Sequence, residues 1–345
     1  MSLGRREFLR RTAGASAAVA AAGSAAVAAG CRSEADEAGP RWDLEAIRKP
    51  DESRVAVLDA AAYDGTLVDT VRRGIQLFEL AIRGKRIVLK PNLVEFDPNG
   101  VINTHPALIA ATIEVLRSMD ARGVVVAEGP GHRRDNEYVL VQSGLFDVLR
   151  DTGTTYVDLN SDSVSPRRVP ARFSGLGTLY LPDTVLEAEL FISMPKLKTH
   201  HWAGVTLSMK NMFGIMPSSI YGWPKNVLHW AGIENCILDI NATLDVPRFN
   251  IVDGIVGMEG NGPIQGDARN VGVLVMGQDP VAVDSTCARL MRIEPWEVSY
   301  LQTASAFLGN LRRERILQLA EDPEPRAQDF AVLPGFAPLK VTAAG

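Results

Sequence analysis

The chain has 345 residues, is 46% hydrophobic and carries a formal net charge of −5. This composition is that of a folded globular protein, and it excludes disordered and collagen-like chains. Residues 1–30 hold four arginines and one glutamate, so the rest of the chain is more acidic than the whole. A nucleic-acid partner, which favours a basic stripe, is therefore not expected.

The first predicted element is an export signal. Arg5-Arg6 begins a twin-arginine pattern, although Gly4 stands where Ser or Thr is usual. The uncharged run 12–30 is too weakly hydrophobic for a convincing membrane span. We predict a twin-arginine signal over residues 1–31, with the twin-arginine translocase as a partner during export. The alternatives are an amphipathic helix and a true membrane anchor.

The end of this segment resembles a lipoprotein processing box. Residues 28–31 read Ala-Ala-Gly-Cys, so Cys31 is the candidate for lipidation. Ala28 stands where a larger aliphatic residue is usual, and cleavage after the Ala-Val-Ala triplet at 26–28 is the alternative. Residues 32–52 are polar and are predicted to form a tether. The expected location is periplasmic or extracytoplasmic, with membrane contact only through the signal or the lipid.

Two further cysteines, Cys236 and Cys287, lie in apolar, helix-like stretches of the body. The chain has no CxxC pair, and an iron–sulfur cluster needs several closely spaced thiolates, so none is expected from this chain alone. Buried free thiols are the preferred prediction, and a disulfide formed outside the cytoplasm is the alternative.

Apolar runs bounded by turns alternate with helical patterns along the body, from residue 53 to about 310. The strand candidates, rich in Val and Ile, are Arg54–Leu58, Arg86–Leu89, Gly123–Ala127, Thr155–Leu159, Thr178–Leu181, Leu190–Met194, Asn250–Val252 and Val271–Met276. The helix candidates are Thr66–Ile82, Pro106–Met119 with Thr104 as a possible N-cap, Gly232–Leu244 and Val281–Met291.

This alternation predicts an α/β domain over residues 53–310. Its sheet is expected to be largely parallel, possibly mixed, with helices on both faces. Residues 311–345 are interpreted as a C-terminal extension. Sheets of this kind place their sites at the carboxyl ends of the strands, so the polar residues there are the functional candidates.

Two early strand ends carry such residues. Lys90 and Asn92 follow the second strand, and both are predicted to bind a ligand. The third strand is followed by a glycine-rich turn that carries His132, and glycine permits close backbone approach to a ligand. His132 is a candidate for proton transfer, with a solvated surface turn as the alternative.

The densest candidate segment is the run 195–202, which follows the strand Leu190–Met194. If it is extended, Lys196, Lys198 and His200 lie on one face. Their positive charges repel unless an anion or acidic side chains lie between them. The alternative is a solvated strand exit. The neighbours His201 and Trp202 are interpreted as packing residues.

A helix is predicted over residues 203–213, with Lys210 and Asn211 along it. A helix N-terminus favours an anion, so this segment adds to the predicted anion site. Near Trp230, Lys225 followed by His229 is another candidate. His229 lies in an apolar neighbourhood, where a structural role and a site role are both open.

A glycine-rich segment follows the strand that ends near Val252. Asp253 lies at the strand end, and Glu259 and Asn261 supply further oxygen ligands. This set suits a hard divalent cation such as Mg²⁺ or Mn²⁺. The four glycines at 254–262 are expected to let a loop bend around a ligand, and a flexible hairpin tip is the alternative. Their spacing matches neither a phosphate loop nor a dinucleotide fingerprint.

Two acidic residues flank the last predicted helix. Asp279 precedes it and is interpreted as its N-cap. Asp284 lies within its first turns, and its role is left open.

Six motifs in this body recur together in a known family. They are Lys-Pro-Asn at 90–92, Thr-His-Pro at 104–106, Pro-Lys-Leu-Lys-Thr-His at 195–200, Met-Lys-Asn-Met-Phe-Gly at 209–214, Asp-Gly-Ile-Val-Gly-Met-Glu-Gly-Asn-Gly-Pro at 253–263 and Asp-Pro-Val-Ala-Val-Asp at 279–284.

With these motifs the chain resembles the family called domain of unknown function 362, from about residue 53 to 305. The resemblance implies no defined activity. Some relatives carry a ferredoxin-like cysteine module that this chain lacks, which speaks against direct electron transfer. A second resemblance, to lactate-racemase-type proteins with a nickel pincer cofactor, rests only on residues 104–106 and 131–133.

Taken together, these features predict an enzyme that acts on a small anionic molecule bearing phosphate or carboxylate. His200 or His132 would transfer a proton, since imidazole titrates near neutral pH. Asp253 and Glu259 would hold a divalent cation or act as base. The predicted ligand-binding residues are Lys90, Asn92, Lys196, Lys198, Lys210 and Asn211.

The same basic cleft also fits two other functions. One is a non-catalytic anion-binding lipoprotein, and the other is an accessory protein of an exported redox or metal enzyme.

Overall fold

The computed structural model describes residues 47, 49–131 and 135–341, which lie in one compact unit, Asp43–Gly345. The predicted export signal, Cys31 and His132 fall outside the described residues, as does the predicted tether 32–52 except for residues 47 and 49–52. None of the helices described here has both the length and the apolar character needed to cross a bilayer.

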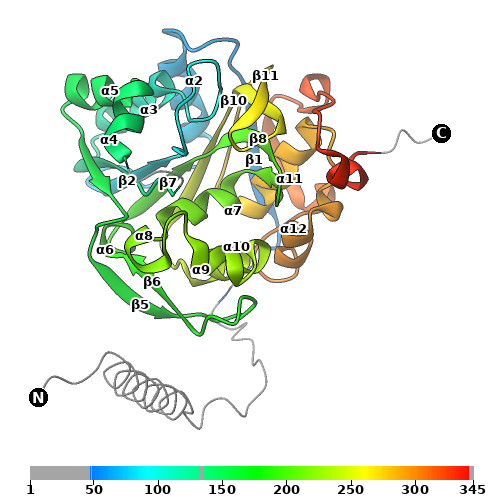
Figure 1. Cartoon of the computed structure of the whole chain (residues 1–345). Coiled ribbons are helices and arrows are strands. Elements are labelled where there is room, and N and C mark those ends of the chain that lie inside the picture. Colours follow the sequence, from blue (N-terminus) through cyan, green and yellow to red (C-terminus); the bar gives the residue numbers. More distant parts are fainter. Residues whose placement is uncertain (1–46, 48, 132–134, 342–345) are drawn as a thin grey trace, which may run out of the picture. The chain divides into compact units, whose positions relative to one another are not determined.

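A ten-stranded sheet forms the centre of this unit (Figure 1). Two further strands, β5 and β6, pair with each other and form a separate sheet. The strands are β1 Ser53–Asp59, β2 Arg86–Pro91, β3 Gly123–Glu128, β4 Thr155–Asp158, β5 Val164–Arg168, β6 Thr178–Pro182, β7 Leu190–Met194, β8 Lys196–His200, β9 Gly204–Thr206, β10 Arg248–Asn261, β11 Gln265–Gly277 and β12 Ile316–Ala320.

Helices connect most of these strands. The α-helices are α2 Leu67–Gln76, α3 Pro106–Ser118, α4 Asn136–Gln142, α5 Leu145–Thr152, α6 Asp183–Leu186, α7 Ser208–Asn211, α8 Ser218–Tyr221, α9 Asn226–Trp230, α10 Ile233–Thr243, α11 Pro280–Leu290 and α12 Ser299–Ala304. Short 3-10 helices are η2 Met212–Ile215, η3 Pro295–Glu297, η4 Arg313–Arg315, η5 Glu324–Arg326 and η6 Pro334–Leu339.

The main path of the large sheet runs β12-β1-β11-β10-β7-β2-β3-β4, and β8 pairs with β10 and β9 beside it. Along this path only β11 runs antiparallel to its neighbours β1 and β10. All other neighbours on the path are parallel. The predicted α/β fold with a largely parallel sheet is therefore confirmed.

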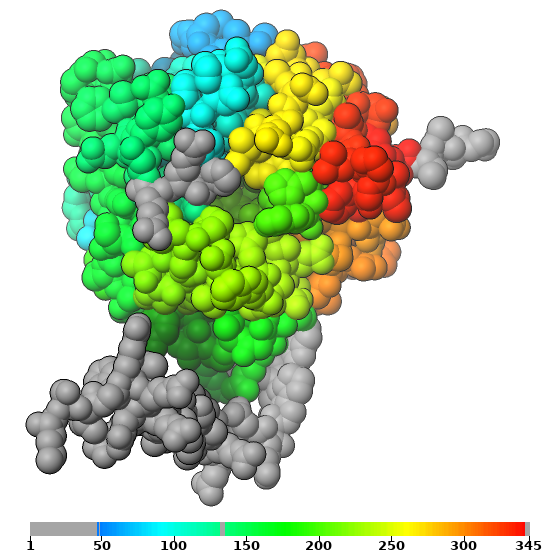
Figure 2. Space-filling model, in the orientation of Figure 1, coloured from blue at the N-terminus to red at the C-terminus, as the bar shows by residue number. Residues whose placement is uncertain are grey.

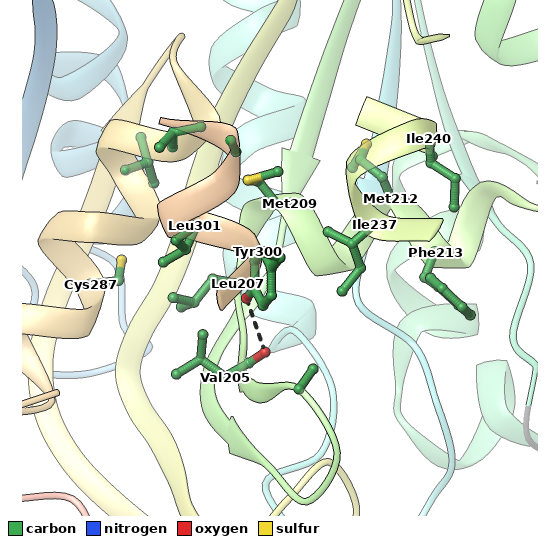
Figure 3. Close-up of a cluster of buried hydrophobic side chains, with 14 of the residues drawn as sticks. Val205, Leu207, Met209, Met212, Phe213, Ile237, Ile240, Cys287, Tyr300 and Leu301 are labelled. Carbon is green, nitrogen blue, oxygen red and sulfur yellow. Dashed lines mark hydrogen bonds between the residues drawn. The ribbon is translucent and has the colours of Figure 1, made fainter. Parts of the chain in front are cut away.

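Helices cover both faces of the sheet because each strand alternates apolar side chains between the two faces. Ala56 and Leu58 of β1 pack in one core with α2, α3 and α5. Val55 and Val57 point to the other core, which includes residues of α7, α10, α11 and α12. Figure 3 shows part of this second core, where Tyr300 of α12 donates to the carbonyl of Val205 at 3.3 Å.

The strand and helix candidates are confirmed, most of them with small differences in their ends. The larger differences are that β10 continues nine residues beyond Val252, β11 begins six residues before Val271 and α2 ends six residues before Ile82.

The N-cap of α3 differs from the prediction. His105 caps the helix, because its Nδ1 accepts from the backbone N–H of Ala107. Thr104 instead donates to the carbonyl of Met194 at 2.6 Å, which joins the turn after β2 to the end of β7.

The helix predicted over 203–213 is wrong in its first half. Residues Gly204–Thr206 form β9, and a short α7 begins at Ser208. Asp284 explains where it begins, because its two carboxylate oxygens accept from the backbone N–H groups of Ser208 and Met209. Asp279 caps α11 as predicted, accepting from Val281 and Ala282.

The glycine-rich segment after Asp253 is strand, not a ligand-wrapping loop, since β10 continues to Asn261. Its glycines make room for the backbone of β8. A Cβ at Gly257 would lie 2.9 Å from the carbonyl of Leu197, and one at Gly262 would collide with the carbonyl of Thr199. Any larger residue at these positions would push β8 away from β10.

The C-terminal residues belong to the same unit as the α/β domain. β12 adds a parallel edge strand to β1, and Phe330 is only 1% exposed within the core. Cys236 and Cys287 are free and buried, which confirms the prediction of free thiols.

The order of connections creates a crevice beside β2. From β2 the chain passes through α3 on one face to β3, whereas β7, on the other side of β2, leads through α7 and α10 on the opposite face to β10. In doubly wound sheets, ligands bind outside the carboxyl ends of the strands at such a switch point.

Candidate functional site

A cavity of about 540 Å³ lies at this crevice. Figure 2 shows the surface there hollowed between the yellow β10–β11 hairpin and the lime segment that holds α7 to α9. The turns after β2 and β3, the end of β8 and the segment from α7 to α9 supply its wall. Among its lining residues are Asn92, Glu128, His200, His201, Trp202, Thr206, Lys210, Asn211, Lys225, His229 and Trp230.

A buried ion pair forms the floor. Lys90 Nζ donates to Glu128 Oε2 at 2.6 Å, to the carbonyl of Pro91 at 2.9 Å and to Asn211 Oδ1 at 3.0 Å. Glu128 Oε2 also accepts from the backbone N–H of Leu93. A charge this deeply buried is stable only with such partners. Lys90 and Asn211 therefore build the site, and their hydrogen bonds are used within the protein.

Lys225 is a second buried lysine, but none of the described carboxylates forms an ion pair with it. Its Nζ donates to the carbonyls of Gly129 at 2.7 Å, Gly214 at 3.0 Å and Phe213 at 3.1 Å. All three donors of the ammonium are thus satisfied. Its backbone is left-handed, with φ 68°, a conformation that is costly for a non-glycine residue and often marks functional sites.

Lys210 differs from both. No hydrogen bond or ion pair joins its amino group to the part of the chain that the structure describes, and its Nζ lies 4.4 Å from the centre of the Phe213 ring. Burial and the nearby charge of Lys90 lower the pKa of Lys210 to about 8. This half-buried amino group lines the cavity and is available to a ligand.

His200 is placed as a hydrogen-bond donor. Its Nδ1 accepts from the backbone N–H of Trp202 at 3.0 Å and of Ala203 at 3.1 Å, so the neutral ring carries its proton on Nε2. Burial, followed by the charge of Lys210, holds the pKa of His200 far below its ordinary value. The geometry favours this donor role over the proton transfer predicted for it.

The opposite tautomer is present at two neighbouring histidines. Nδ1 of His201 lies 2.7 Å from the carbonyl of Gly262, and Nδ1 of His229 lies 3.0 Å from the carbonyl of Lys225. Because a carbonyl only accepts, both Nδ1 atoms are protonated, and Nε2 of each neutral ring is a proton acceptor. Burial lowers the pKa of His229, which keeps its ring neutral.

Aromatic rings surround the cavity entrance. Trp202 is 60% exposed and Trp230 is 80% exposed, yet both line the cavity. The ring centres of His201 and Trp202 are 4.6 Å apart, and those of Trp202 and His229 are 5.5 Å apart. Trp202 was interpreted as a packing residue, but its side chain is mostly exposed, because it lies in the turn 201–203.

Two polar atoms in the cavity wall lack a partner. Asn92 Oδ1 and Thr206 Oγ1 are buried and form no hydrogen bond with the described residues. The two side chains are 7% and 4% exposed. A buried polar atom without a hydrogen bond costs about 1–3 kcal/mol. A polar ligand that forms hydrogen bonds with these two atoms would remove that cost.

Lys196 and Asp253 form a separate cluster. Lys196 Nζ donates to Asp253 Oδ2 at 3.0 Å and to the hydroxyl of Tyr63 at 2.8 Å. That hydroxyl donates to Asp253 Oδ1 at 2.7 Å, and the backbone N–H of His105 donates to Oδ2 at 3.0 Å. Tyr63, His105 and Lys196 line a smaller cavity of about 230 Å³. In this cluster the carboxylate is matched by internal donors.

Lys198 connects the walls of the two cavities. Its Nζ donates to the carbonyl of Ile102, in the smaller wall, at 2.8 Å, and to the carbonyl of Pro263, in the larger wall, at 3.3 Å. Burial and the charges of Lys196 and Lys210 lower the pKa of Lys198 well below its ordinary value. The lysines predicted to bind one anion are thus divided between two clusters.

The residues predicted to hold a metal are not brought together. Asp253 is engaged in the cluster with Lys196, whereas Glu259 accepts from the backbone N–H of Ala331 and faces Arg269 at 3.6 Å. Asn261 donates to Gln265 at the surface. Over the described ranges, no group of three His, Cys, Asp or Glu side chains is placed to hold a metal ion.

Sequence reasoning missed several cavity residues. Glu128 and Thr206 gave no signal by themselves, and Lys225 was noted only as a neighbour of His229. Glu128 ends a buried strand, and a carboxylate at the carboxyl end of a parallel strand is a signal that could have identified it.

Comparisons with known proteins agree with the motifs. The family model described as domain of unknown function (DUF362) matches residues 87–289. The thylakoid-associated protein sll1697 of Synechocystis sp. is 26% identical over 258 residues, which cover 70% of this chain and 75% of that protein.

Two solved structures are also similar. A Thermotoga maritima protein has a TM-score of 0.40 and 11% identity, over 67% of this chain and 59% of that one. The lactate racemase apoprotein of Thermoanaerobacterium thermosaccharolyticum has a TM-score of 0.42 and 14% identity, over 71% of this chain and 58% of that one. This chain thus spans less than two thirds of either structure, and likenesses of this size carry no argument about activity.

Proposed function

This chain belongs to the DUF362 family, whose description assigns no activity, and from its basic cavity we propose that it binds a small anionic molecule and acts on it by proton transfer. The volume of about 540 Å³ lies within the range of small-molecule sites. One observation carries the proposal. The amino group of Lys210 lines this cavity without a hydrogen bond to any described residue.

The electrostatics support an anionic ligand. Of Lys90, Lys198, Lys210 and Lys225, only Lys90 forms an ion pair with a carboxylate in the described chain. Burial, and after it the charge of Lys90, lowers the pKa of Lys210; burial, and after it the charge of Lys210, lowers the pKa of His200. An anion between these groups would relieve that repulsion.

Proton transfer is assigned to His201 and His229 in place of His200. Both present an unprotonated Nε2 in the neutral ring, and both line the cavity. A neutral imidazole accepts a proton near neutral pH. His200 would instead donate its Nε2–H to an oxygen of the ligand.

A calorimetric titration with sulfate and with acetate tests the anion site. We expect Lys210→Met to weaken binding by roughly tenfold or more, because it removes a charge at the ligand. Lys85→Met is the matched control, since Lys85 lies on the surface beside Glu189 at 3.8 Å. Equal affinity in the wild type and Lys210→Met would refute the proposal.

A binding protein that returns its ligand unchanged is the second candidate. The donor role of His200 favours it, because a ring with so low a pKa holds a ligand without exchanging protons. Mass spectrometry of the molecule retained on gentle purification, before and after incubation with fresh protein, separates the two. A changed mass or isomer supports the enzyme, and an unchanged one supports the binding protein.

A further inference from the structure

Two lysines line the cavity, and their amino groups differ in the number of hydrogen-bond acceptors around them. All three N–H donors of Lys225 are fixed by the carbonyls of Gly129, Phe213 and Gly214. Burial lowers the pKa of Lys225 to about 7, but its three acceptors hold the amino group in place, so its nitrogen does not point to a ligand. Lys210 has no acceptor among the described residues and rests on the face of Phe213. Of the two, only Lys210 is free to turn its nitrogen toward a ligand.

The surroundings of Lys210 make its neutral amine easier to form than that of an ordinary lysine. The lysine is desolvated and close to the charge of Lys90, and these two causes lower its pKa to about 8. A lysine in an apolar pocket or beside another cation is the usual form of an amine nucleophile in enzymes. Lys90 cannot take this role, because its three donors are used by Glu128, Pro91 and Asn211.

We propose that Lys210 is an amine nucleophile that forms an imine with the carbonyl carbon of an anionic aldehyde or ketone, such as a 2-oxo acid, bound in this cavity. The proposal rests on the proposed anion site and names its ligand class. The ligand needs an acidic group, for the basic wall, and a carbonyl within reach of Lys210.

The chemistry balances without a further reactant. The lone pair of Nζ attacks the carbonyl carbon, and the π electrons of the C=O bond move to oxygen, which takes a proton. Loss of one proton from nitrogen and of water from the carbinolamine leaves the C=N bond. Nε2 of His201 or His229 accepts and returns the proton, and Nε2–H of His200 donates a hydrogen bond to the oxygen. Water reverses the reaction.

Reductive trapping tests this directly. The wild-type protein is incubated with pyruvate and sodium cyanoborohydride, and modified lysines are located by peptide mass spectrometry. We expect Lys210 to be modified at least about tenfold faster than Lys85, since a basic cleft concentrates anionic ligands. Acetone, a neutral ketone, should show no such preference.

Two variants distinguish the loss of the reactive amine from a loss of the fold. Lys210→Arg retains the positive charge, but a guanidinium remains protonated and forms no imine. It should bind sulfate within about threefold of the wild type and show no adduct at position 210. Lys85→Met should keep the adduct at Lys210. Thermal unfolding of each variant confirms that it is folded.

The outcomes separate this inference from the proposed function. An adduct concentrated at Lys210, with sulfate as a competitor, supports both. Sulfate binding that depends on residue 210, without preferential modification of Lys210, overturns the imine and leaves the anion site. Absence of both sulfate binding and modification overturns both.

Discussion

At the scale of single residues, the chemistry depends on how each buried amino group is matched. Lys90 forms an ion pair with Glu128, and Lys196 forms one with Asp253. The ammonium of Lys225 donates its hydrogen bonds to three carbonyls. Lys210 is left for a ligand. Burying an ammonium without a partner costs several kcal/mol in principle, so an unmatched lysine beside matched ones is the strongest sign of a binding site here.

The protonation of Lys210 gives a pH dependence for anion binding. Because its pKa lies at about 8, Lys210 is charged below that pH and attracts an anion. Above that pH it loses its charge, so affinity should fall as pH rises through about 8. Calorimetric titration with sulfate from pH 6 to 9.5 measures this.

Sulfate suits this titration because its own charge is constant over the range. In Lys210→Arg the guanidinium remains charged, so the fall near pH 8 should be reduced. An affinity in the wild type that is constant across pH 8 would contradict the assignment of Lys210 to the anion.

At the scale of elements, the approach of β8 to β10 brings the two clusters close together. Pairing sets Lys196 opposite Asp253 and Lys198 opposite Met258, with an irregular register between them. The β8 backbone lies so close to β10 that glycine is needed at Gly257. A strand that begins two residues after β7 can thereby carry its basic side chains across the end of the sheet.

Gly257→Ala tests this packing. Its Cβ would lie 2.9 Å from the carbonyl of Leu197 and 3.1 Å from the ring of Phe330. Overpacking of this kind costs about 1–3 kcal/mol, so the free energy of unfolding in urea should fall by that amount.

The control is Gly123→Ala, where no described atom beyond the two adjacent residues lies within 4 Å of the new Cβ. There the change should be neutral or stabilising by up to about 1 kcal/mol. Equal effects at the two positions would show that β8 does not constrain Gly257.

At the scale of the whole unit, the last described residues complete the core. β12 lies beside β1 at the sheet edge, and the ring of Phe330 and the β8 residue Leu197 both lie next to Gly257. The segment predicted as an extension therefore supports the strand that carries Lys196, Lys198 and His200.

Phe330→Ala is expected to lower the free energy of unfolding by about 3–5 kcal/mol, as for other buried aromatic residues. Phe146→Ala is the matched control, because Phe146 is 49% exposed and Phe330 is 1% exposed. Surface changes of that kind usually stay within about 0.5 kcal/mol. Urea denaturation followed by circular dichroism measures both, and a small effect at Phe330 would place the C-terminal segment outside the cooperative unit.

The sequence by itself determined most of the local structure and the edge of the sheet where the candidate site lies. Apolar periodicity located the main strands and helices because side-chain alternation is a local property. The rule that parallel sheets bind ligands at their carboxyl ends identified Lys90, Asn92 and His200, and the motifs identified the family.

Only the tertiary structure decided what each polar residue does. The roles of Lys90 and Lys210 differ because Glu128, 38 positions from Lys90 in the sequence, reaches one amino group and not the other. The tautomers of His200 and His201 were set by backbone groups in turns and in the hairpin. The glycine-rich end of β10 was predicted to be a loop, because β8, the strand that packs against these glycines, is distant from them in the sequence. Charge pairing, tautomers and close packing depend on distant neighbours, and a single sequence does not contain those distances.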